Sequence, residues 1–137
     1  MATQSDLMGL GVPVYHAERL GVTPRIATAF GTSAGSANPI GPTGYLTFCL
    51  TGTSSFLLPP VGGANGCLLG DTFIIANMSG ASVQIYAANT PQGSAVTIFF
   101  KAASLAGTTG ASLQSGFPAI FKPITVSTWV ALVGGSA

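Results

Sequence analysis

The sequence predicts an all-β fold, a compact antiparallel β-sandwich or jelly-roll-like domain preceded by a short N-terminal helical arm. After Arg25 the chain consists of short runs rich in Val, Ile, Thr and Phe, separated by Gly, Pro, Asn and Ser. No long helical pattern follows Gly21, which argues against βαβ units and a parallel wound sheet. At 137 residues the chain is long enough to bury a core as one domain. We therefore expect an arm over residues 1–25 and a single β-domain over residues 26–137.

The arm is predicted to contain a helix of about eight residues. Pro13 suits the first helical position, where its missing N–H is not needed, and Gly21 suits the position just past the end. Between them Val14, Ala17 and Leu20 recur at helical spacing and form one apolar stripe. An isolated helix needs roughly 12–15 residues to be even marginally stable, so this one must dock on something.

Docking of the arm is expected to use its apolar side chains, either on another subunit or on a larger partner. These side chains are Leu7, Leu10, Val14, Ala17 and Leu20. The same stretch holds the only histidine, His16, close to Glu18 and Arg19. A Ser–His–acid site would need His16, but a short, marginal helix is a poor scaffold for it. We interpret His16 as an exposed or interface residue.

Eight strands are expected in the β-domain: Arg25–Phe30, Tyr45–Leu50, Ser55–Leu58, Thr72–Asn77, Ser82–Ala87, Ala95–Phe100, Ala119–Lys122 and Thr128–Val133. Several alternate apolar and polar residues with the period of two that is typical of strands. The turn "NMSGAS" supplies Asn77 and Gly80 for positions of positive φ. The Gly-, Pro- and Ser-rich segment 31–44 is expected to be a long loop, extended or interface-forming, and 106–110 is expected to link two later strands.

The low charge of the chain predicts an obligate assembly. Hydrophobic residues make up 47% of the sequence, whereas charged residues make up only 5%, against about 25% in typical domains. Such a surface would be poorly soluble as a lone monomer, because charge keeps proteins apart. The predicted edge strands also lack the charged residues that normally prevent edge pairing, which indicates that these edges are buried between subunits.

Several function classes are disfavoured by the same composition. The net charge is +1 and the four Lys and Arg are scattered, so no nucleic-acid partner is expected. The uncharged segment 26–70 is interrupted by polar residues and by Pro59–Pro60, so no membrane partner is expected. One His, two Cys and three acids lack ligand spacing, so we expect no metal, no cofactor and no catalytic residue. The opening "MATQSD" lacks the pattern of a signal peptide, so synthesis in the cytoplasm is expected.

Five single positions have a functional and a structural interpretation. We expect Cys49 and Cys67 to be buried thiols, the alternative being a disulfide. Asp71 is expected to accept backbone hydrogen bonds in a turn, the alternatives being a metal ligand or an interface ion pair. Trp129 is expected to be a core anchor or a subunit-interface residue rather than a sugar-binding platform. The glycosylation sequon at Asn77 is interpreted as a chance match.

Three stretches resemble a β-module of tailed-bacteriophage virion proteins. They are "FLLPP" at residues 56–60, "GDTFIIANMSGASVQIYAA" at 70–88 and "SGFPAIFKPITVSTWVALV" at 115–133. The opening "SDLMGLGVPVYHAERLG" is similar to the start of small phage proteins encoded near the major capsid protein. After the tyrosine the family often continues with Pro and a Gly-rich hairpin, whereas residues 88–110 here are longer and more apolar.

The resemblance implies a non-enzymatic structural protein of the phage head. The expected function is that of a capsid decoration or cement protein, which binds the assembled shell and stabilises it. The expected partners are the major capsid protein and further copies of the chain in a homotrimer, on the exterior of a virion assembled in the host cytoplasm. The alternative is a head fibre or tail-associated knob that binds a receptor or glycan.

Overall fold

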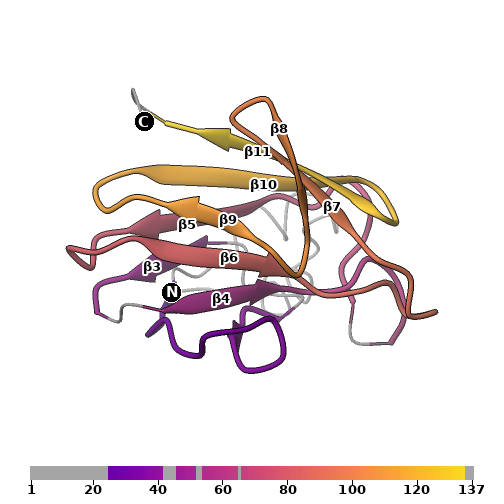
Figure 1. The fold of residues 1–137 in the computed structure, drawn as a ribbon, viewed down its shortest axis with the longest axis horizontal. Helices are drawn as coiled ribbons and strands as arrows, with labels where there is room; N and C mark the ends of the chain where they lie inside the picture. The colour runs from indigo at the N-terminus through magenta and orange to yellow at the C-terminus, as the bar shows by residue number, and fades with distance from the viewer. Residues whose placement is uncertain (1–24, 42–45, 52–53, 65, 135–137) are drawn as a thin grey trace, which may run out of the picture.

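Two β-sheets pack face to face around one hydrophobic core (Figure 1). The computed structural model describes residues 25–41, 46–51, 54–64 and 66–134. Within these ranges the chain forms eleven strands and no helix, which confirms the all-β prediction. The predicted arm helix, with His16 and the docking residues Leu7, Leu10, Val14, Ala17 and Leu20, lies outside the described residues.

The larger sheet has seven strands in the order β1-β3-β5-β10-β11-β7-β8. Their bounds are β1 Arg25–Ile26, β3 Leu46–Cys49, β5 Phe73–Asn77, β7 Thr97–Phe100, β8 Ala103–Ala106, β10 Pro118–Thr125 and β11 Thr128–Val133. The smaller sheet has the order β2-β4-β6-β9. Its strands are β2 Asn38–Pro39, β4 Ser55–Leu58, β6 Val83–Ala87 and β9 Ala111–Leu113.

Both sheets are mixed, so the prediction of an antiparallel sandwich is wrong in its pairing. Among the described strands five pairs are parallel, namely β1–β3, β3–β5, β11–β7, β2–β4 and β4–β6. The first six strands alternate between the sheets, so a strand of the opposite sheet separates each sequential pair within one sheet. The intervening strand carries the chain back along the sandwich, and the next strand therefore runs parallel to the first.

Three strands were not predicted. β2 lies within the segment 31–44 that was expected to be a loop, where its two residues pair with β4 and Ile40 is buried beside it. β8 and β9 are short and consist largely of Ala, Ser and Leu, which give little signal of strand propensity. Their formation depends on pairing with β7 and β6. Pairing with a neighbouring strand thus overrides local propensity in all three.

The core lies between the inward-facing side chains of the two sheets. The larger of them that are fully buried are Phe56, Leu58, Phe73, Ile75, Val83, Ile85, Ile98, Leu113, Phe121 and Trp129. The ring centroids of Trp129 and Phe73 are 5.7 Å apart with an interplanar angle of 59°, a tilted aromatic contact between β11 and β5. The only tryptophan is therefore a core residue and not an exposed sugar platform.

Asn77 joins the two sheets at the end of β5. Its Nδ2 donates to the carbonyl oxygens of Ala81 (2.7 Å) and of Leu113 in β9 (2.9 Å). Its Oδ1 accepts from the backbone N–H and the hydroxyl of Ser79 (3.1 and 2.7 Å). In the predicted turn Gly80 has the expected positive φ of 85°, whereas Asn77 contributes through its side chain from within the strand. Because these groups are engaged and Asn77 is fully buried, the sequon is not accessible in the folded chain.

The β7–β8 turn contains two consecutive residues in the left-handed region, Lys101 (φ 51°) and Ala102 (φ 64°). Two-residue hairpin turns of this kind favour Asn–Gly, because both central residues need positive φ. Left-handed backbone costs a non-glycine residue roughly 1–2 kcal/mol.

We expect Ala102→Gly to raise the free energy of unfolding by about 0.5–1 kcal/mol, since relief of strain exceeds the added entropy of the unfolded chain. Urea unfolding followed by the fluorescence of Trp129 measures it. The control is Ala103→Gly in β8, which has no positive φ to relieve and should lose about 0.5–1 kcal/mol. If both variants lose the same free energy of unfolding, the turn is not strained.

Candidate assembly surfaces

The outer face of the seven-stranded sheet, the side turned away from the core, is apolar. Strand register aligns Leu46, Ile74, Ile120 and Leu132 in one row across β3, β5, β10 and β11. In water-facing sheets this side normally carries polar residues, in alternation with the buried ones. Leu132 is 65% exposed and Ile120 37% exposed, so the row has no cover among the described residues. An apolar row of this kind is typical of a surface that another element covers.

Neighbouring rows extend the apolar surface in both directions. One row consists of Ile26, Phe48, Ala76 and Pro118, and Ile26 at its edge is 71% exposed. The other consists of Lys122, Val130 and Phe99. Lys122 is the one charged side chain that the described residues place on the outer face, and it lies in the last of these rows.

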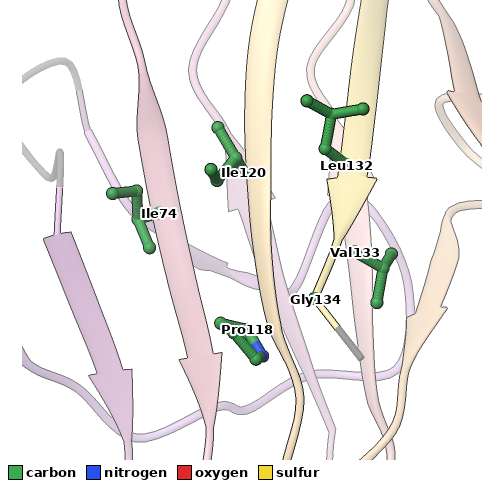
Figure 2. Close-up of a pocket in the computed structure, with 6 residues that line it drawn as sticks. All are labelled: Ile74, Pro118, Ile120, Leu132, Val133 and Gly134. Atoms are coloured by element: carbon green, nitrogen blue, oxygen red, sulfur yellow. The ribbon is translucent and has the colours of Figure 1, made fainter. Parts of the chain in front are cut away.

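A depression lies on the outer face over β5, β10 and β11, toward the end at which β10 begins and β11 ends (Figure 2). Its lining residues are Ile74, Pro118, Ile120, Leu132, Val133 and Gly134, and its volume is about 360 Å³. Ligand sites for small polar molecules need a few convergent polar groups to fix orientation, and this lining offers no polar side chain. A cavity of about 150 Å³ already holds a benzene-sized group. The depression therefore suits apolar side chains of a protein segment better than a metabolite.

A second apolar surface, which we call the tip, lies at one end of the sandwich, on the loop between β4 and β5 and on the end of β10 with the loop that follows it. It consists of Leu68, Leu69, Ile124 and Val126, which are 72%, 56%, 55% and 55% exposed. The backbone N–H of Gly70 donates to the carbonyl of Pro123 (3.3 Å), which holds the two segments side by side. The β10–β11 turn and the segment between β4 and β5 meet at the right-hand end of Figure 1. The tip has no cover from the described residues.

Asp71 shapes the loop of the tip. Its Oδ2 accepts a hydrogen bond from the backbone N–H of Leu68 (2.9 Å), and its own N–H donates to the carbonyl of Leu68 (3.2 Å). The expected structural role, a carboxylate accepting backbone hydrogen bonds before β5, is confirmed. This turn exposes Leu68 and Leu69, which makes Asp71 a positioning residue for the tip.

Cys67, next to the tip, is a buried free thiol, as is Cys49, in agreement with the prediction of buried thiols. The pKa of Cys67 is raised from 9.0 to about 11, chiefly by burial and also by the negative charge of Asp71, while a backbone hydrogen bond acts in the opposite direction. The thiol of the folded chain therefore keeps its proton at pH values at which the unfolded chain has lost it.

We expect the free energy of unfolding to fall as the pH rises from about 9 to about 11. In this range the unfolded state binds fewer protons than the folded state, so the slope of stability against pH is negative. Below pH 9 both states hold the proton and Cys67 contributes no slope. Urea unfolding at several pH values should show this decline in the wild type and a smaller one in Cys67→Ala. The same decline in both would contradict the assignment.

His16, which a Ser–His–acid site would need, lies outside the described residues. Within the described ranges no group of three or more His, Cys, Asp or Glu is placed to hold a metal ion. Nor do these ranges contain a helix of the length and apolarity needed to cross a bilayer.

Sequence reasoning missed the outer face, although a signal was present. The strands "FIIAN", "PAIFKPIT" and "TWVALV" carry large apolar residues at both odd and even positions, so both of their faces are apolar. Such strands are covered on both sides. Leu68, Leu69 and Val126 of the tip gave no comparable signal, because isolated apolar residues in loops are common.

No protein-family model, curated protein or solved structure matches this chain.

Proposed function

We propose that this protein is a non-enzymatic structural component of a tailed-phage head, a decoration or cement protein that binds the assembled shell. The observation that carries the proposal is the tip, an exposed apolar surface that no described residue covers, on a chain with only 5% charged residues. Exposed apolar residues gathered at one place often mark a surface that a partner covers. Static burial of such surfaces requires no catalytic group.

The particular assembly is proposed from the resemblance of residues 5–21 and 56–133 to phage virion proteins. In this proposal the chain acts as a homotrimer, contacts the major capsid protein and lies on the outside of the capsid. A sandwich of the jelly-roll-like kind is part of the same proposal, supported by the single core shared by two sheets. The tip is the candidate for the contact with the shell or a second subunit, because nothing described in the chain covers it.

Repetition over the shell makes modest contacts sufficient. A standard interface buries about 1,600 Å² in total. A trimer that engages three such sites at once binds more tightly still, because the first contact raises the effective concentration of the other two subunits at their sites. Uncharged surfaces are suited to this role, since many copies side by side do not repel each other.

The proposal is tested by removing the protein from the particle. Heads from a phage that lacks this chain should rupture at lower temperature than wild-type heads, and addition of purified protein should restore the wild-type temperature. Ile124→Asp at the tip should reduce restoration at least tenfold at limiting protein, because it places a charge in an apolar contact. Ser112→Asp, exposed on the other sheet, is the matched control and should restore normally. If heads that lack this chain rupture at the same temperature as wild-type heads, the proposal is wrong.

A further inference from the structure

We propose that residues 7–20 of the same chain cover the outer face of the seven-stranded sheet. The proposal goes beyond the virion function and does not depend on it, since it concerns packing within one subunit. It gives the apolar row of Leu46, Ile74, Ile120 and Leu132 a definite occupant.

The N-terminal segment joins the described chain at this sheet. β1 is the edge strand beside β3. Arg25 pairs with Thr47, and Thr47 is the neighbour of Leu46, the first residue of the apolar row. Residues 21–24 separate Leu20 from β1, and four extended residues span at most about 14 Å. Three strand spacings from β1 to β10 amount to about 14 Å as well. Residues 21–24 are therefore long enough for Leu20 to reach the depression at Ile120.

The chemistry of the segment complements the face. Leu7, Leu10, Val14, Ala17 and Leu20 recur at intervals of three or four residues, the spacing that places side chains on one side of a helix. The depression that they would meet is lined by Ile74, Pro118, Ile120, Leu132, Val133 and Gly134. His16, Glu18 and Arg19 fall between these apolar positions. Covering the face would replace an apolar surface with a charged one and improve solubility.

The size of the face favours a short segment over a second copy. Four strands about 4.8 Å apart and about five residues long present roughly 300 Å². A stable interface between two proteins takes about 800 Å² from each partner, so this face alone is too small for it. An eight-residue helix is about 12 Å long and crosses two to three strands. The residues that line the depression come from β5, β10, β11 and the residue after β11.

Cysteine labelling of the full chain tests the proposal. In a Cys49→Ala, Cys67→Ala background, Leu132→Cys reports on the outer face and Ser112→Cys on the exposed face of the other sheet. We expect a maleimide to react with Cys at 132 at least tenfold more slowly than at 112. Adding Val14→Asp and Leu20→Asp should bring the two rates within about twofold, whereas His16→Asp should leave the protection intact. The fluorescence of Trp129 verifies that each variant is folded.

A second measurement distinguishes the same chain from a neighbouring one. Ala17→Cys with Ile120→Cys in the same background should oxidise to a disulfide within one chain, which migrates as a single subunit on a non-reducing denaturing gel. Equal labelling at positions 132 and 112 in the parent background overturns the proposal. Disulfides that link only separate chains overturn it too, and would show that a second copy supplies the segment.

Discussion

Asn77→Ala is expected to lower the free energy of unfolding by about 3–5 kcal/mol, more than any surface substitution in the chain. The change removes the two donors that satisfy the carbonyls of Ala81 and Leu113, and the acceptor used by Ser79. Each buried polar group left without a partner costs about 1–3 kcal/mol. The measurement is urea unfolding, monitored by Trp129.

Asn38→Ala is the matched control for this prediction. Asn38 also donates from Nδ2, to the carbonyl of Thr28 (2.7 Å), but it lies at the partly exposed edge strand β2, where water can replace the bond. We expect a loss of about 1 kcal/mol or less. Similar losses at both positions would show that Asn77 is not the connection between the sheets that its hydrogen bonds indicate.

Phe73→Ala is expected to lower the free energy of unfolding by about 3–5 kcal/mol, the usual cost of a cavity left by a buried ring. Phe73 is fully buried in β5 and contacts Trp129 across the sheet. The variant should also change the emission of Trp129 in the folded state, because the contacting ring is gone. Urea unfolding and emission spectra of the folded protein measure the two effects.

Phe99→Ala serves as the control, since Phe99 is 44% exposed on the outer face of β7. Its loss should be about 1 kcal/mol or less, with the emission of Trp129 unchanged. A loss at Phe99 as large as at Phe73 would contradict the assignment of inner and outer faces.

Local patterns predicted the strands with strong signals and failed where pairing alone forms the strand. The expected strand Ser55–Leu58 is β4 residue for residue, and Thr128–Val133 is β11. β2 and β9 have weak propensity and pair with strands that no local window contains, whereas β8, equally weak, pairs with the preceding strand β7 across a two-residue turn. Four of the five parallel pairs were missed for a related reason: they follow from alternation of the first six strands between the sheets, and a strand pattern does not say which sheet the strand joins.

The sequence predicted that the chain has apolar surfaces for assembly, but not where these surfaces lie. The scarcity of charge predicted that much of the surface is covered, and the exposed Leu132, Ile120, Leu68 and Ile124 are surfaces of that sort. Their position depended on register, since Ile74, Ile120 and Leu132 are far apart in the chain and meet only through pairing. The expected docking residues of the arm lie outside the described residues, so their role remains a prediction.

Copy number per particle tests the proposed function most directly. Quantitative mass spectrometry of purified virions would compare peptides of this chain with peptides of the major capsid protein. A decoration protein should be present in hundreds of copies, in a fixed ratio to the shell subunit. About a dozen copies per particle, or none, would contradict the proposal, and the former result would favour a fibre or tail-associated knob.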